Sequence, residues 1–233
     1  MFARHNRVWL SKDGWARAAD VHSTHAHILM QWAENDWPVI VRRRDVDMPL
    51  NMVALGIPLP PDIASKKKGR IAFTAHRDQI RCNEGALNVH DIQTALPSRW
   101  QHIHARLCKQ AVSTQLEFRV YGSLAMQALT GLPYLTDQSD IDLLLAPRSR
   151  AELTNGLAML SEYVQLLPLD GEIVFPSGRA VAWKEWLQVD DTGQNIYVLT
   201  KSMEAVALVR AEELLDELPD ELSTALPDEW KTR

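Results

Sequence analysis

Hydrophobic and polar positions in the first third of the chain predict strands and one helix. The apolar runs RVWLS and WPVIVRRR predict strands at residues 7–11 and 37–44, and a helical pattern lies between them. Residues 48–70 are rich in proline and glycine, which predicts irregular structure. The run IAFTA at residues 71–75 predicts another short strand.

After Pro97 the pattern predicts an alternation of helices and strands. Helices are expected after three serines, each of which can act as an N-cap: Ser98, Ser123 and Ser149. Strands are expected at residues 116–121, 141–145, 172–175 and 179–183. A last helix is predicted over residues 203–218, because apolar positions recur there at helical spacing, and Lys201 would precede it.

The order of these elements predicts an α+β protein with two domains. A polar stretch at residues 76–97 separates them, so we place an N-terminal domain at residues 1–85 and a C-terminal domain at 86–233. The N-terminal domain is expected to be a small α/β unit and the C-terminal one a mixed sheet with flanking helices. Charge supports the division: residues 1–85 hold 13 basic and 9 acidic residues, a net of +4, and the remainder is net −9.

Composition narrows the class of protein. The 233 residues are 46% hydrophobic and 24% charged, as is ordinary for a globular protein. No apolar run is as long as a membrane span, and the first ten residues lack the apolar core of a signal peptide. The two cysteines have no metal-type spacing. We therefore expect a cytoplasmic protein with no membrane partner, and the net charge of −5 argues against nucleic-acid binding.

Two aspartates interrupt an apolar run in SDIDLLL. On a strand, Asp140 and Asp142 would share one face, while Ile141, Leu143 and Leu145 would face the core. Two carboxylates that point the same way are typical ligands of Mg²⁺, which fills its shell with water and phosphate oxygens. The structural alternative is that Asp140 only begins the strand, but this does not explain Asp142.

The dipeptide Gly122-Ser123 lies where a strand turns into a helix. A glycine lets a phosphate approach the backbone, and the start of a helix offers unpaired N–H groups. The sequence therefore predicts a phosphate site at Gly122 and Ser123 and a metal site at Asp140 and Asp142, which together indicate phosphoryl chemistry.

The motif VYGS, followed after 16 intervening residues by DIDLLL, resembles the signature of polymerase-β-type nucleotidyltransferases, although their loop is usually shorter. Further segments resemble one family, the phosphoribosyl-dephospho-CoA transferases of malonate decarboxylase, also called holo-acyl-carrier-protein synthases. These segments are RHNRVWL, WPVIVRRRD, LGIPLPP, KKKGRIAF and DGEIVFPSGRAVAWKEW. The resemblance covers most of residues 4–190.

This resemblance implies a specific reaction and fold. The family transfers a 2'-(5''-phosphoribosyl)-3'-dephospho-CoA group from triphosphoribosyl-dephospho-CoA to a serine of the apo acyl-carrier subunit of malonate decarboxylase, and diphosphate leaves. It implies a nucleotidyltransferase-like sheet in residues 86–233 and a recognition role for residues 1–85. The cofactor would be Mg²⁺, with Mn²⁺ as an alternative, held by Asp140 and Asp142. Gly122 and Ser123 would face the donor phosphates.

The superfamily resemblance also implies a third carboxylate, for which the sequence offers Glu172 and Asp170. Asp170 precedes a glycine and can belong to a turn, whereas Glu172 would lie on the non-core face of its strand. We therefore assign the third metal-binding and catalytic position to Glu172, which could also act as general base, and keep Asp170 as the alternative.

Basic residues give further candidates for substrate binding. Arg42 and Arg43 lie in a predicted strand, and Lys201 could reach a phosphate. With Arg44, the lysines at positions 66–68 and Arg70 they form a cluster that could meet phosphates or an acidic carrier protein. The alternative is a solvated edge strand that resists aggregation.

Two other functions fit the same residues. One is a different magnesium-dependent nucleotidyltransferase that modifies a small molecule or a protein. The other is a non-catalytic binding protein on the same scaffold, which the presence of both Asp140 and Asp142 disfavours.

Overall fold

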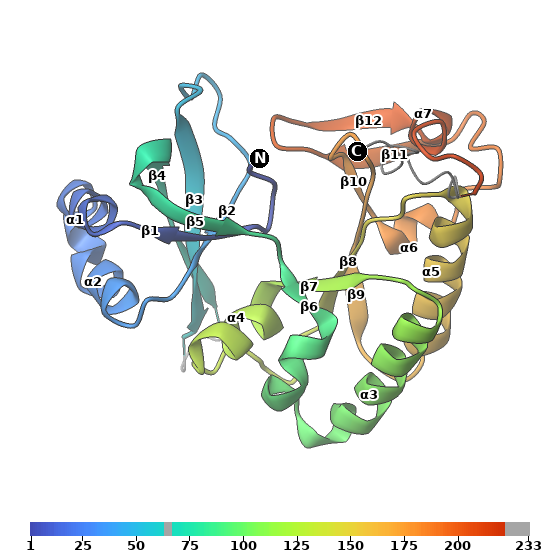
Figure 1. The fold of residues 1–233 in the computed structure, drawn as a ribbon, viewed down its shortest axis with the longest axis horizontal. Helices are drawn as coiled ribbons and strands as arrows, with labels where there is room; N and C mark the ends of the chain where they lie inside the picture. Colours follow the sequence, from blue (N-terminus) through green and yellow to red (C-terminus); the bar gives the residue numbers. More distant parts are fainter. Residues whose placement is uncertain (63–66, 222–233) are drawn as a thin grey trace, which may run out of the picture.

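Two β-sheets form the framework of the protein (Figure 1). The computed structural model describes residues 1–62 and 67–221, so the lysine at position 66 of the predicted basic cluster lies outside it. The mixture of helices and sheets in a two-domain layout confirms the predicted α+β class. None of the helices in the described ranges is long and apolar enough to cross a membrane.

The N-terminal sheet is antiparallel, with the strand order β4-β3-β2-β1-β5. Its strands are β1 (Arg7–Leu10), β2 (Val39–Val41), β3 (Met52–Pro61), β4 (Lys68–His76) and β5 (Ile80–Glu84). Its helices are α1 (Lys12–Val21), η1 (Ser23–His25), α2 (Ala26–Glu34) and η2 (Arg77–Gln79). Helices α1 and α2 lie together on one side of this sheet (Figure 1), where they bury Trp15, Leu29 and Trp32.

The prediction of irregular structure over residues 48–70 was wrong, because β3 and β4 form a long hairpin there. Prolines usually break sheets since they lack an N–H donor. Strand β3 pairs with β2 only around Leu55 and Gly56, so its prolines come later, where β4 is its neighbour. The register also shifts between Pro58 and Pro61. The prolines thus occupy a stretch that pairs on one side, as strands tolerate.

The C-terminal sheet is mixed, with the order β12-β11-β10-β9-β8-β7-β6. Its strands are β6 (Leu87–Asn88), β7 (Phe118–Tyr121), β8 (Ile141–Leu145), β9 (Leu169–Val174), β10 (Ala180–Ala182), β11 (Tyr197–Lys201) and β12 (Val206–Arg210). Its helices are η3 (Val89–Ala95), α3 (Ser98–Ser113), α4 (Gly122–Thr130), α5 (Arg150–Tyr163), α6 (Trp183–Trp186) and α7 (Ala211–Leu215). Strands β8 and β9 are parallel and are connected through α5, while the other pairs are antiparallel.

The predicted helix over residues 203–218 was also wrong, because β12 occupies its first half and only α7 is helical. Lys201 therefore ends a strand, β11. Buried and exposed positions alternate along β11, with Val198 and Thr200 inside. Ser202 makes the turn to β12, since its hydroxyl accepts hydrogen bonds from the N–H groups of Glu204 and Ala205.

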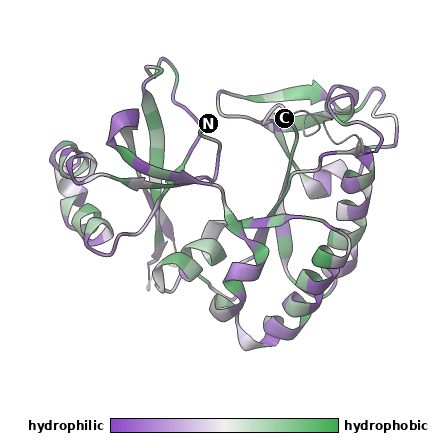
Figure 2. Ribbon diagram, in the orientation of Figure 1, coloured by the Kyte–Doolittle hydropathy of each residue, from purple (hydrophilic) through white to green (hydrophobic). Residues whose placement is uncertain are grey.

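Apolar side chains join the two halves. In Figure 2 green positions run along the strands of both sheets, whereas purple positions are frequent on the outer turns of α3 and α5. Met126 and Tyr134 of the C-terminal half are almost fully buried within the core of the N-terminal sheet. The Tyr134 hydroxyl also donates to the carbonyl of Pro58 over 2.8 Å. The two sheets are therefore held together by buried contacts as well as by the chain.

Gly171 permits the close pairing of β9 with β8. Its φ is +135°, and a Cβ atom built there would overlap the backbone of Leu143, its partner in the parallel register. Since the overlap is with backbone, no rotamer change can relieve it.

We expect Gly171→Ala to lower the free energy of unfolding by roughly 3 kcal/mol or more, because strain at φ and overlap add. Urea unfolding measures this. Gly178→Ala is the matched control: Gly178 also has a positive φ, of +81°, but an added Cβ would meet nothing within 4 Å. Equal losses in the two variants would contradict the assigned overlap.

Candidate active site

A strand–helix junction forms the centre of the site. Strand β7 ends at Tyr121, and Gly122 begins α4 with a φ of +71°. A Cβ atom on Gly122 would overlap the carboxylate of Asp142. Only glycine therefore allows this carboxylate to lie directly against the backbone at the start of the helix. The phosphate site expected at Gly122 and Ser123 stays a prediction.

Three carboxylates gather beside this junction. Asp140 is exposed just before β8, and Asp142 is half-buried within it, opposite Tyr121 of β7. On the other side of β8, the parallel register pairs Asp142 directly with Asp170 of β9. Asp170 also lies 3.5 Å from the ammonium group of Lys184. The structure thus surrounds Asp142 with acidic neighbours from two elements.

The electrostatics of this cluster favour a bound cation. Burial, and then the negative charges of Asp170 and Asp140, raise the pKa of Asp142 to about 6, although the charge of Lys68 opposes the rise. Mutual repulsion of this kind is relieved when a divalent ion binds. Among the described residues, no group of three or more His, Cys, Asp or Glu side chains is placed so that it could hold a metal ion on its own. The carboxylates fit an ion whose remaining ligands are water and phosphate oxygens, as is usual for Mg²⁺.

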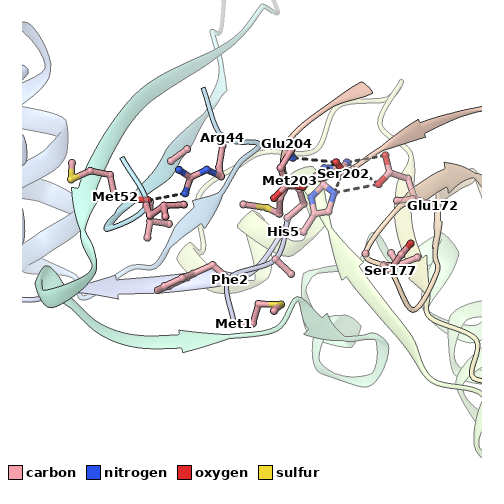
Figure 3. A pocket seen from close by; sticks show the side chains of 18 of the residues that line it. Met1, Phe2, His5, Arg44, Met52, Glu172, Ser177, Ser202, Met203 and Glu204 are labelled. Atoms are coloured by element: carbon pink, nitrogen blue, oxygen red, sulfur yellow. Dashed lines mark hydrogen bonds and ion pairs between the residues drawn. The ribbon is translucent and has the colours of Figure 1, made fainter. Parts of the chain in front are cut away.

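Glu172 lies on the same strand but in a different environment. It is 4% exposed, and its carboxylate accepts hydrogen bonds from Arg4 at 2.8 and 3.1 Å and from Lys201 at 2.9 Å. The Nε2 atom of His5 is 3.5 Å away. Burial alone would raise the pKa of Glu172, but His5, Lys201 and Arg4 together hold it well below its usual range. In Figure 3 Glu172 and His5 lie close together among the residues that line a pocket.

The geometry therefore favours Asp170 over Glu172 as the third member of the acidic cluster. In the parallel register Glu172 pairs with Leu144, which is two residues further along β8 than Asp142. Its oxygens are already occupied by two cations, so it is poorly placed to bind a metal or to accept a proton. Its contacts instead tie the N-terminal segment to the C-terminal sheet, a role for Arg4 that the sequence did not reveal.

The basic candidates separate into different roles. Arg42 forms a two-pronged ion pair with Asp45, and Arg44 donates to the carbonyls of Met48 and Pro49, so both stabilise their own segment. Arg43 is exposed. Lys201 reaches Glu172 rather than the carboxylate cluster. One cavity is nevertheless lined by Arg42, Arg43, Arg44, Arg70 and Lys201 together.

Several cavities lie between the halves. One, of about 650 Å³, is lined by Met1, Glu172 and Ser177 (Figure 3). Two others adjoin each other at Tyr121. The larger, of about 860 Å³, is lined by basic and aromatic side chains that include Arg43, Arg70, Tyr121 and Lys201. The smaller, of about 240 Å³, is lined by Gly122 and Asp142 and by apolar side chains from both sheets. Tyr121 and Arg70 belong to both. A long ligand with phosphate groups and an apolar part could therefore extend from the carboxylates into the larger cavity.

Comparison with known proteins identifies the family. A family model described as the phosphoribosyl-dephospho-CoA transferase MdcG C-terminal domain matches residues 86–212, and the corresponding N-terminal domain matches residues 3–83. The chain belongs to the phosphoribosyl-dephospho-CoA transferase family. It is therefore a transferase, as the sequence predicted.

Curated relatives with this family name cover most of the chain. A phosphoribosyl-dephospho-CoA transferase of Bradyrhizobium diazoefficiens is 34% identical over 210 residues, which are 88% of this chain and 89% of the relative. One from Xanthomonas campestris pv. campestris is 36% identical over 188 residues, 80% of this chain and 86% of the relative. One from Xanthomonas axonopodis pv. citri is 34% identical over 204 residues, 87% and 91% of the two chains. No solved structure matches.

The raised pKa of Asp142 predicts a gain in stability when its charge is removed. A carboxyl whose pKa is higher in the folded state than its ordinary 3.8 destabilises the fold when ionised. We expect Asp142→Asn to raise the free energy of unfolding at pH 8, without divalent metal, by about 1–2 kcal/mol. The gain should vanish below about pH 4, where the Asp142 carboxyl is protonated in both the folded and the unfolded protein. Urea unfolding at the two pH values measures it, and a loss of stability at pH 8 would contradict the crowding.

Glu172 should behave in the opposite way. Glu172→Gln leaves Arg4 and Lys201 without their shared partner at a buried position, so we expect a loss of about 3 kcal/mol at pH 7. Because the pKa of Glu172 is lowered, the stability that it supplies is present above its ordinary value of 4.5 and is lost as the pH falls below it. Asp170→Asn is the matched control. Equal stability of the two variants at pH 7 would overturn the structural role of Glu172.

Proposed function

We propose that this transferase moves the 2'-(5''-phosphoribosyl)-3'-dephospho-CoA group from triphosphoribosyl-dephospho-CoA to a serine of the apo acyl-carrier subunit of malonate decarboxylase. The observation that carries the proposal is the crowded carboxylate cluster against Gly122, in a chain of the phosphoribosyl-dephospho-CoA transferase family. An acidic cluster beside a phosphate-binding backbone is the arrangement that phosphoryl transfer requires.

The proposed step is an in-line displacement. The serine oxygen forms a bond to the α-phosphorus of the donor, and the bond from that phosphorus to the oxygen bridging to the β-phosphate breaks. Diphosphate leaves with the electron pair. The serine proton passes to a nearby carboxylate, for which we propose Asp170, because Glu172 is occupied by Arg4 and Lys201.

The chain's own groups position the reactants. The N–H groups at the start of α4 face the phosphates, and Gly122 lets them approach closely. Asp140, Asp142 and Asp170 would hold Mg²⁺, which when bound neutralises charge on the phosphate oxygens. The larger cavity, lined by Arg43 and Tyr121, would receive the rest of the donor. Most of the catalytic effect would then come from orientation and charge neutralisation.

Mass spectrometry of the carrier subunit tests the reaction. We expect the apo subunit, after incubation with the triphosphate donor, Mg²⁺ and this protein, to gain the mass of the prosthetic group as diphosphate appears. ATP in place of the donor should leave the carrier unmodified. An unmodified carrier in the complete reaction would contradict the proposal, and a nucleotide attached from ATP would indicate a different nucleotidyltransferase.

Asp140→Asn should slow this transfer roughly 10²–10³-fold, because a lost metal ligand removes several kcal/mol of transition-state stabilisation. Asp137→Asn is the matched control, since Asp137 is an exposed aspartate three residues earlier in the same loop. Single-turnover rates with the purified carrier measure both. Similar rates in the two variants would remove Asp140 from the site.

A further inference from the structure

Strand β4 belongs to the N-terminal sheet, but two of its basic side chains point toward the C-terminal half. Its buried positions are Ile71, Phe73 and Ala75, which pack in the core of the N-terminal sheet. Side chains alternate along a strand, so Lys68 and Arg70 lie on the opposite face, and both are exposed. The alternation that buries one face of β4 thus leaves two cations on the other.

Lys68 reaches the strand–helix junction of the catalytic sheet. Its ammonium group donates a hydrogen bond to the Ser123 hydroxyl over 2.8 Å, across 55 positions of sequence. An ammonium carries three donors, and Ser123 is its only hydrogen-bonding partner found within residues 1–62 and 67–221. Lys68 is also close enough to Asp142 for its charge to lower that carboxyl's pKa. The side chain therefore lies between the serine and the acidic cluster with donors to spare.

Arg70 continues the same face into the cavities. It lines both the larger cavity, with Tyr121 and Lys201, and the smaller one, with Gly122 and Asp142. No ion pair involves its guanidinium in the part of the chain that the structure describes. Lys68 and Arg70 therefore form a row of positive charge that begins at Ser123 and continues into the two cavities.

We propose that Lys68 and Arg70 of the N-terminal sheet bind the polyphosphate of the donor, with Lys68 at the phosphates above Ser123 and Arg70 further into the cleft. The proposal rests on the proposed function for the identity of the donor. Lys68 offsets the charge that accumulates on the departing diphosphate, so it acts on the chemical step as well as on binding. The N-terminal domain is then part of the active site.

Four variants test this: Lys68→Met, Lys68→Arg, Arg70→Met and the control Lys12→Met. Lys12 is an exposed lysine of the same domain, on α1 at the far side of the sheet (Figure 1). Calorimetry with inorganic tripolyphosphate gives affinity without any transfer, and steady-state kinetics give KM for donor and carrier. Thermal unfolding confirms that each variant is folded.

We expect Lys68→Met and Arg70→Met each to weaken tripolyphosphate binding about 10–100-fold, as for a lost charged hydrogen bond. The donor KM should rise, the carrier KM should stay within about twofold of wild type, and kcat should fall in Lys68→Met. Lys68→Arg should keep most of the affinity, and Lys12→Met all of it.

Wild-type tripolyphosphate affinity and donor KM in Lys68→Met and Arg70→Met would overturn the proposal, as would an equal loss in Lys12→Met. Failure of the proposed function gives a different result: the wild-type protein would bind tripolyphosphate through Lys68 and Arg70 but would not modify the carrier.

Discussion

The parallel pairing of β8 with β9 determines where the acidic side chains lie. It places Asp142 beside Asp170. Glu172 lies two residues further along β9, where it contacts Arg4 of the N-terminal segment. A slip of β9 by one residue would turn Ile173 away from the core and Asp170 toward it, so the core face fixes the register. Gly171 makes the approach of the two strands sterically feasible. The chemistry of the site therefore depends on a backbone constraint at a residue that carries no functional group.

A second constraint holds the two halves in relation to each other. Glu172 binds Arg4, whose guanidinium also donates to the carbonyl of Lys201. A buried ionic contact adds little net stability. It nevertheless restricts how the two halves can be placed relative to each other, because any placement that leaves a buried charge unpaired is costly. Together with the buried Tyr134, this contact keeps the N-terminal sheet close to the catalytic one. The cavity that Arg43, Arg70 and Lys201 line is formed by both halves in this arrangement.

Much of the C-terminal half could be predicted from the sequence because its signals are local. Asp142 stands out as a charge inside an apolar strand, Gly131 ends α4 with a positive φ, and Ser149 caps α5. Asp170 and Glu172 have the same parity on β9, so alternation could not distinguish them; the difference comes from the register with β8 and from Arg4, 168 residues away. Long-range pairing of this kind leaves no local trace in a sequence.

Two of the errors of secondary structure have the same origin. The prolines of β3 suggested irregular structure, and the apolar spacing after residue 203 suggested a helix. In both cases pairing with a neighbouring strand determines the structure, and the local sequence pattern carries no information about that strand. Helix α1, which the sequence pattern did not predict, and the expected N-caps Ser98 and Ser123, which make no capping hydrogen bond, are separate errors. The contact of Lys68 with Ser123 could not be predicted either. The sequence does contain the basic run, but its partner becomes apparent only when the two sheets face each other.

The central proposal is that Asp142 and Asp170, rather than Glu172, would hold the metal ion that we propose for the transfer. Electron paramagnetic resonance with Mn²⁺ as the probe, in the presence of the triphosphate donor, measures bound ion directly. The account predicts that the bound signal is lost or much weakened in Asp142→Asn and Asp170→Asn and is retained in folded Glu172→Gln. A full signal in Asp170→Asn together with its loss in Glu172→Gln would contradict it.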